Sequence, residues 1–239
     1  MPLTGQLKVE PVDEGPESGE EQQRELVAPA GNPLAIIDNL VYLFFVNHVV
    51  HIRGVAVFSD HAIAEQAFVD HSPESAPPAS RRSMEAVRRN LGHLPPAVAR
   101  LAASPHTLDG FLQLSALFER TTLDPVAREV VIMTVAARNE CHVCVVMHTG
   151  KLRALGAGEE TVAALVGQRP LHDERLEAVR RFTLDVIAAS GAVGDDALAA
   201  FFGHGFTPQN ALEVVMGIGT YTLSTFANRL TRAPLEPTA

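Results

Sequence analysis

The hydrophobic pattern of this chain is helical over most of its length. Apolar side chains recur every three or four positions from Arg81 onward, which is the spacing of one face of an α-helix. Two clear runs are those of Leu108, Phe111, Leu114 and Phe118, and of Leu176, Val179, Phe182 and Val186. The sequence shows no short-period repeat beside them. The pattern predicts an all-α fold.

Proline and capping residues indicate where the predicted helices begin and end. Asp124-Pro125 supplies an N-cap acceptor followed by proline at the first helical position, so we expect a helix from there to about Arg138. Asn139 is then expected to cap the next helix, which the glycine of Leu155-Gly156 would end. Further helices are expected at about residues 159–166, at 173–190, and from Thr207-Pro208 onward.

Two of these helices allow a prediction about which faces are buried. In the last helix we expect one stripe to face the core, formed by Leu212, Val215, Met216, Gly219, Leu223, Phe226 and Leu230. The helix after Asp124 is apolar on more than one face, since Glu129 lies opposite Ala127, Val130, Val131 and Thr134. Because apolar surface on several faces favours association, we expect a homo-oligomer.

Composition divides the chain into segments with different character. Residues 1–30 contain seven acidic and two basic residues, a net charge of −5, and are expected to be a disordered acidic tail. An apolar N-terminal extension follows, expected to be helical although Val41 to Val50 also fits a strand, and it ends in the linker-like stretch SPESAPPAS. The four predicted segments are thus residues 1–30, 31–80, 81–232 and the C-terminal tail 233–239.

Charge and apolar run lengths exclude some classes of partner. The chain carries 28 acidic and 19 basic residues, whereas nucleic-acid binding depends on clustered cations. The longest apolar run, Leu40 to Val46, is too short to span a bilayer, and the acidic N-terminus has no apolar leader segment. We therefore expect a cytoplasmic protein that binds neither nucleic acid nor membrane.

His48 and His51 are spaced as a pair of metal ligands could be, but no carboxylate or cysteine nearby completes a metal site. The two histidines are therefore interpreted as packing residues.

The two cysteines of the chain are the first sign of chemistry. Cys141 and Cys144 form a C-x-x-C pair, and His148 follows four residues later, so a helix would place all three on one stripe. A thiol reacts as its thiolate, which the N-terminus of a helix stabilises. A second cysteine nearby can trap a sulfenic acid as a disulfide. The pair therefore favours redox chemistry.

Glu129 is the second sign, because its neighbours on the same helical stripe are all apolar: Val126, Ile132, Met133 and Ala136. Burial in such surroundings would raise the pKa of the carboxyl and suit it to accept and return a proton. If the two helices around Asn139 form an antiparallel hairpin, Glu129 and His148 each lie about 12–15 Å from the turn. We therefore expect the two side chains to face each other.

Two other interpretations of the cysteine pair stay open at this point. Cys141, Cys144 and His148 could hold zinc in a structural module, although a fourth ligand would be needed and His142 points off the stripe. Alternatively, the pair could report redox state in an interaction protein that turns over poorly.

The spacing of these residues resembles a known signature. Glu129, Cys141, Cys144 and His148 fit E-x11-C-x-x-C-x3-H, which is similar to the pattern of the carboxymuconolactone decarboxylase superfamily in its AhpD-like alkylhydroperoxidase branch. The surrounding stretches LDPVAREVVIMTVAARNECHVCVVMHTGKLRALG and TPQNALEVVMGIGTYTLSTFANRL also resemble the family. The likeness covers about residues 95–232 and does not extend to residues 1–80, whose properties it leaves open.

The resemblance implies an AhpD-like helical fold with an N-terminal extension, oligomers, and a thiol peroxidase or disulfide reductase activity. Cys144 would be the peroxidatic sulfur, Cys141 the resolving sulfur, Glu129 the proton acceptor and His148 a relay that orients it. The expected partners are a small hydroperoxide and an external dithiol reductant, with no bound cofactor and no metal.

The sequence departs from the family at one position. Members often carry His or Tyr directly before the second cysteine, whereas this chain has Val143 there and the histidine one position earlier, at His142. The resemblance therefore does not extend to a relay through that side chain. The decarboxylase branch generally lacks the C-x-x-C pair, so the presence of both sulfurs speaks against decarboxylation.

Overall fold

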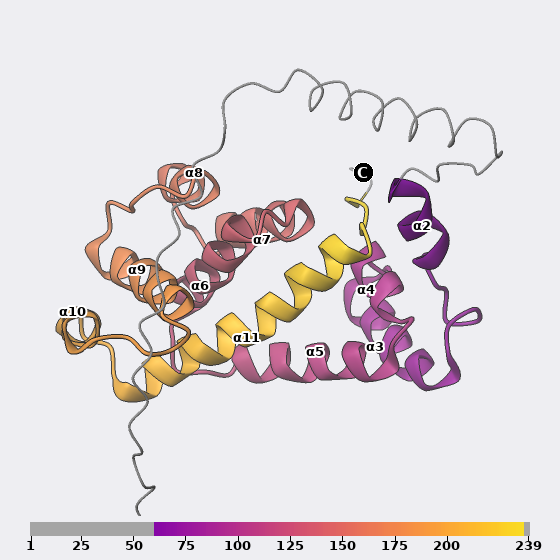
Figure 1. Ribbon diagram of the computed structural model, residues 1–239, viewed down its shortest axis with the longest axis horizontal. Helices are drawn as coiled ribbons and strands as arrows, with labels where there is room; N and C mark the ends of the chain where they lie inside the picture. The colour runs from indigo at the N-terminus through magenta and orange to yellow at the C-terminus, as the bar shows by residue number, and fades with distance from the viewer. Residues whose placement is uncertain (1–59, 237–239) are drawn as a thin grey trace, which may run out of the picture. The chain divides into compact units, whose positions relative to one another are not determined.

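The computed structural model describes residues 60–236, which form helices and turns without any strand (Figure 1). The all-α prediction is confirmed for this part of the chain. The helices are α2 (Asp60–Ala67), η1 (Pro78–Ser80), α3 (Arg81–Leu91), α4 (Pro96–Leu101), α5 (Pro105–Phe118), α6 (Pro125–Arg138), α7 (His142–Ala154), α8 (Glu159–Val166), α9 (Glu174–Ala188), α10 (Asp195–Gly203) and α11 (Pro208–Leu230). The predictions for the acidic tail, the start of the extension, His48 and His51 lie outside the described residues.

Helix α6 is the centre of the fold, and it packs against α7, α8, α9 and α11. Its N-cap is Asp124, as predicted, whose side chain accepts a hydrogen bond from the backbone N–H of Ala127. Every residue from Val130 to Ala137 is buried. The supposed second face of α6 is thus covered by helices of the same chain, so it gives no support to self-association. That argument from the sequence was wrong.

Helix α11 crosses the molecule diagonally beside α5 and α6 (Figure 1), but its orientation differs from the prediction. Four residues of the predicted inner stripe are largely exposed: Leu212 at 72%, Val215 at 47%, Phe226 at 58% and Leu230 at 66%. The face turned inward is mostly polar, and it includes Asn210, Glu213, Thr220, Tyr221, Ser224, Thr225 and Asn228.

Hydrogen bonds explain why α11 buries its polar face. The Glu213 carboxylate accepts hydrogen bonds from the backbone N–H groups of Thr122 and Leu123, at 2.9 and 3.2 Å, and from the Thr122 hydroxyl. These N–H groups belong to the loop before α6 and would otherwise lack partners. A paired carboxylate can therefore be buried where apolar periodicity predicts a leucine.

One apolar cluster holds α3, α4 and the start of α5 together, and it contains Ala76, Met84, Val98, Leu101, Ala102 and Leu108. The linker-like stretch 72–80 packs into it, because Ala76 is buried and the Ser80 hydroxyl donates to the carbonyl of Ala102 at 2.8 Å. Helix α10, which was not predicted from the sequence, packs against α9. No helix between residues 60 and 236 is long and apolar enough to cross a membrane.

Candidate active site

The turn between α6 and α7 places the two cysteines. Asn139 ends α6, and Glu140 adopts a left-handed backbone conformation with φ of +52°. The N-cap of α7 is therefore Cys141. The prediction from the sequence, that Asn139 caps this helix, was wrong. The Asn139 side chain instead donates to the Thr225 hydroxyl of α11 at 2.9 Å, and the Arg229 guanidinium binds the Asn139 carbonyl. Helix α11 thus holds the turn in place.

The sulfur atoms of Cys141 and Cys144 lie 3.0 Å apart, within hydrogen-bond distance, and both cysteines are free thiols. Each residue is only 1% exposed. Their surroundings are apolar, with Ala136, Val143 and Val145 in contact. Because the pair is closed off from water and the sulfurs touch, the ionisation of one depends directly on the other.

The thiols have opposite pKa shifts. The pKa of Cys141 is lowered to about 6, because the hydrogen bond between the two sulfurs stabilises its thiolate. Burial opposes this, while the backbone N–H of Cys144, the Asn228 amide and the Arg229 charge assist it. The same sulfur–sulfur hydrogen bond, together with burial, raises the pKa of Cys144. The pair therefore carries one negative charge near neutral pH, held mainly at the N-terminus of α7.

Helix α11 contributes two residues to this centre that sequence reasoning missed. The Asn228 amide nitrogen lies 3.3 Å from the Cys144 sulfur, and Ser224 hydrogen-bonds the same atom in a way that lowers the pKa of its thiol. Asn228 is 4% exposed. A polar stripe with helical spacing, formed by Tyr221, Ser224, Thr225 and Asn228, is the sequence signal that could have indicated them.

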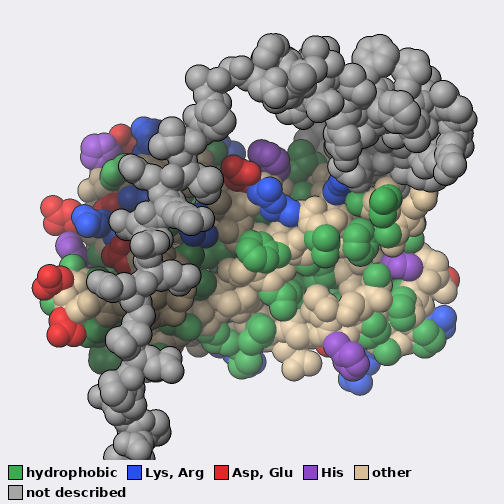
Figure 2. All heavy atoms as spheres, viewed as in Figure 1, with side chains coloured by type: hydrophobic (Ala, Val, Ile, Leu, Met, Phe, Trp, Pro, Cys, Tyr) green, Lys and Arg blue, Asp and Glu red, His purple; other side chains and the backbone are tan. Residues whose placement is uncertain are grey.

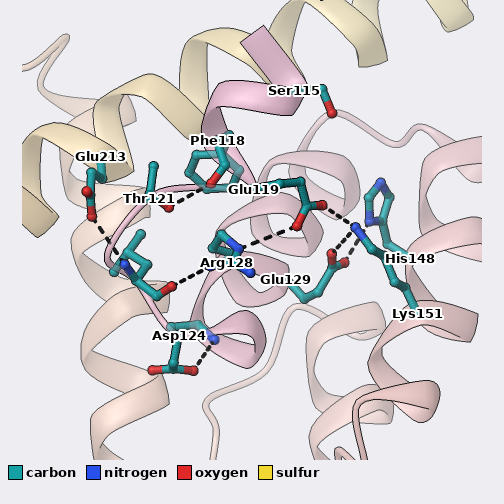
Figure 3. A network of polar contacts seen from close by, with 12 residues as sticks. Ser115, Phe118, Glu119, Thr121, Asp124, Arg128, Glu129, His148, Lys151 and Glu213 are labelled. Carbon is teal, nitrogen blue, oxygen red and sulfur yellow. Dashed lines mark hydrogen bonds and ion pairs between the residues drawn. The ribbon is translucent and has the colours of Figure 1, made fainter. Parts of the chain in front are cut away.

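Glu129 and His148 face each other across the α6–α7 hairpin, as the spacing predicts (Figure 3). The carboxylate Oε2 and the imidazole Nδ1 are 2.7 Å apart, and both residues are buried. Burial by itself raises the pKa of Glu129, but the hydrogen bond and charge of His148 and the charge of Lys151 outweigh it. The pKa is therefore lowered, opposite to the expectation from the sequence, and Glu129 is a carboxylate at neutral pH.

Lys151 connects this buried pair to the surface. Its ammonium lies 3.0 Å from Glu129 Oε1 and also pairs with Glu119, which in turn lies 3.6 Å from the Arg128 guanidinium (Figure 3). The Lys151 side chain is 43% exposed. The Tyr221 ring packs edge-on against His148 at 5.5 Å between centroids. The carboxylate thus sits at the inner end of a charged chain that reaches solvent.

The sulfur pair and the Glu129–His148 pair share one face of α7. Cys144 and His148 are one helical turn apart, and with Leu152 they form the buried stripe of this helix. The hydrogen bonds identified within residues 60–236 do not join either sulfur to His148 or Glu129. In the same range, no three His, Cys, Asp or Glu side chains converge so as to hold a metal ion. The zinc interpretation therefore gains no support.

Comparison with known proteins agrees with this geometry. A sequence profile of the Carboxymuconolactone decarboxylase family matches residues 105–184, the segment that contains Glu129, both cysteines and His148. Curated protein sequences gave no match.

Two solved structures show the same fold. One, titled alkylhydroperoxidase AhpD core, is an uncharacterized peroxidase-related protein from Ralstonia eutropha JMP134, with 22% identity and a TM-score of 0.63 over 71% of this chain and 91% of that one. The other is an uncharacterized peroxidase-related protein from Silicibacter sp. TM1040, with 20% identity and a TM-score of 0.57 over 72% and 91%. The match to the Carboxymuconolactone decarboxylase family thus covers Glu129, both cysteines and His148, and the two solved structures show that the helical fold is AhpD-like.

Proposed function

We propose that this protein is a thiol-dependent hydroperoxidase, or a disulfide reductase acting through the same two sulfurs. The observation that carries the proposal is the contact between Cys141 and Cys144, reduced and 3.0 Å apart, one helical turn from a buried histidine–carboxylate pair. Sulfurs at this separation can become a disulfide with small side-chain movements. The low pKa of Cys141, about 6, provides the thiolate that such chemistry needs at neutral pH.

The oxidative half of the cycle converts one hydroperoxide to an alcohol and water. The shared proton moves to Cys141, and the Cys144 thiolate attacks the terminal peroxide oxygen, so that an S–O bond forms, the O–O bond breaks, and the alkoxide leaves. Cys141 then gives up its proton and attacks the Cys144 sulfenic acid, which releases hydroxide and leaves the disulfide. Two electrons pass from the sulfurs to the peroxide, and an external dithiol returns them.

Glu129 and His148 relay one solvent proton in this scheme. The two sulfurs together hold one proton at rest, whereas the alkoxide and the hydroxide that leave require two. With Nδ1 held by the Glu129 carboxylate, the Nε2 atom of His148 is the nitrogen left for proton exchange. Lys151 links this pair to solvent, from which the proton can be replaced. We assign Glu129 and His148 this relay role, and it requires no resident cofactor.

The proposed partners follow from the buried site. Both sulfurs are almost fully covered, which favours a small hydroperoxide as the oxidant, with an external dithiol as the reductant. A compartment that keeps thiols reduced, such as the cytoplasm, suits the cycle. We also propose homo-oligomer formation through the exposed apolar residues of α11, because Figure 2 shows apolar side chains gathered on the face where α11 and α5 run.

A peroxide assay with a dithiol reductant tests the proposal. The wild-type protein should consume a small organic hydroperoxide and form the Cys141–Cys144 disulfide, detected by mass spectrometry. Cys144→Ser should abolish consumption, whereas Cys141→Ser should still give one sulfenic acid per chain that a dimedone-type reagent traps. His148→Ala should slow turnover, while His142→Ala, which changes an exposed histidine two residues before Cys144, should not.

Two results would reject the assignment. Full turnover by Cys144→Ser would transfer the nucleophilic role to Cys141, and absence of turnover in the wild type would remove the peroxidase activity itself. In the latter case the 3.0 Å contact between the two reduced sulfurs favours the second candidate, a redox sensor that forms the disulfide reversibly. The sensor requires that reversible disulfide formation changes assembly or partner binding, which light scattering of the oxidised and reduced protein measures.

A further inference from the structure

The two polar atoms of the Asn228 side chain differ in their hydrogen bonding. Its amide nitrogen lies 3.3 Å from the Cys144 sulfur, while its carbonyl oxygen Oδ1 is buried and has no hydrogen-bond partner within residues 60–236. Buried polar atoms are nearly always paired, so an orphaned acceptor beside a reactive sulfur indicates a group that binds there. Such a group must donate a hydrogen bond to Oδ1 and must approach Cys144.

The position of Asn228 is fixed by the fold. It lies in the last turn of α11, where its backbone carbonyl accepts a hydrogen bond from the N–H of Ala233 at 2.9 Å. The neighbouring Arg229 anchors the Asn139 carbonyl, so this end of α11 and the cysteine turn are held together. The amide is therefore preorganised relative to the sulfur, as a binding group must be.

The geometry points to Asn228 as a further catalytic residue, whose Oδ1 accepts the O–H of the hydroperoxide while Nδ2 stabilises the Cys144 thiolate. This inference rests on the proposed peroxidase function. The terminal oxygen of a hydroperoxide carries the only hydrogen on the peroxide bond, and it is the atom that sulfur attacks. An acceptor beside Cys144 therefore selects the correct oxygen. After attack, the same Oδ1 accepts the O–H of the sulfenic acid, so the contact is kept along the step.

Comparing two electrophiles isolates this role. In a Cys141→Ser background, we would measure the rate constants of Cys144 with a small hydroperoxide and with methyl methanethiosulfonate, which needs the thiolate but has no N–H or O–H to donate. Asn228→Ala and the larger Asn228→Leu should slow the peroxide reaction by about 10²-fold, the usual loss for one preorganised group. The methyl methanethiosulfonate rate should fall much less, so the ratio of the peroxide rate to that rate should drop in both variants.

Asn228→Asp provides the reverse case, because it keeps an acceptor but loses the donor. Both rates should fall together there as the thiolate loses its stabilising N–H, and their ratio should stay near the wild-type value. Asn210→Ala is the matched control, since Asn210 is a buried asparagine near the other end of α11 that bonds Thr122 and Glu213. It should change the stability of the fold and leave both rates unchanged.

The possible results distinguish failure of the Asn228 role from failure of the proposed peroxidase function. If the background protein reacts with methyl methanethiosulfonate but not with peroxide, the peroxidase proposal fails and the role of Asn228 fails with it. If peroxide reacts and the ratio in Asn228→Ala and Asn228→Leu equals that of the background, Asn228 only supports the thiolate or the fold, and this inference alone is overturned.

Discussion

Gly217 on α11 allows a sharp test of the packing that positions the site. A Cβ atom added there would lie 2.7 Å from two ring carbons of Phe118 and 2.9 Å from a methyl carbon of Val131, and both of those residues are fully buried. Carbon atoms prefer separations of about 3.5–4.0 Å. The glycine therefore lets α11 approach α5 and α6 closely, and Gly217→Ala must push the helices apart.

The magnitude follows from two opposing effects. Overpacking a dense core costs about 1–3 kcal/mol, and three contacts below 3.0 Å place this site at the upper end. Replacing glycine by alanine inside a helix gains about 1 kcal/mol. We therefore expect Gly217→Ala to lower the free energy of unfolding by about 2 kcal/mol. Gly150→Ala in α7, where an added Cβ would meet no atom of residues 60–236 within 4 Å outside the nearby backbone of its own helix, should instead raise it by up to about 1 kcal/mol.

The two variants are best compared by urea denaturation followed by far-UV circular dichroism, since the chain has no tryptophan to report on unfolding. The protein concentration must be the same throughout, because assembly makes apparent stability depend on concentration. A difference of about 3 kcal/mol corresponds to roughly 6–12 °C in melting temperature for a chain of this size. If Gly217→Ala is as stable as the wild type, α11 does not approach Phe118 and Val131 as closely as the structure shows.

Three further predictions concern the charges of the site. Thiolate absorbance of the reduced protein should titrate with a midpoint near pH 6, and Cys141→Ser should remove that transition; a midpoint above pH 8 would contradict the pairing of the sulfurs. Glu129→Gln should lower the free energy of unfolding at pH 7 by about 1.5–3 kcal/mol, the contribution of a hydrogen bond to a charged group. Because the pKa of Glu129 is lowered on folding, this loss should be fully present above the unfolded value of about 4.3 and should shrink as the pH falls through the folded value; a pH-independent loss would be inconsistent with an ionised Glu129. Lys151→Met should raise the pKa of Glu129 and move the acid limb of the peroxide reaction to higher pH, while Lys151→Arg should leave it near the wild-type position; identical profiles for both would exclude a charge effect.

The parts of the site that lie close together along the chain could be predicted without coordinates. Cys141, Cys144 and His148 share a helix, and Glu129 lies opposite His148 because the helices on either side of a short turn run antiparallel. Their side-chain types and spacing also indicated the family whose profile matches residues 105–184. Local rules of capping and periodicity placed α6 and α11 correctly, since those rules depend only on neighbouring residues.

Contacts between distant segments were decided by the tertiary structure. Asn228 reaches Cys144 only because α11 packs beside the hairpin, and the face that α11 buries depends on Glu213 finding donors in the loop before α6. The pKa shift of Glu129 is opposite in sign to the predicted shift, and the cause is again contacts between distant segments. Apolar neighbours along the helix predicted a raised pKa, whereas His148 and Lys151, brought close by folding, stabilise the charge. Periodicity along one helix records which residues are apolar, but the partners that make a polar residue stable in the interior come from elsewhere in the chain.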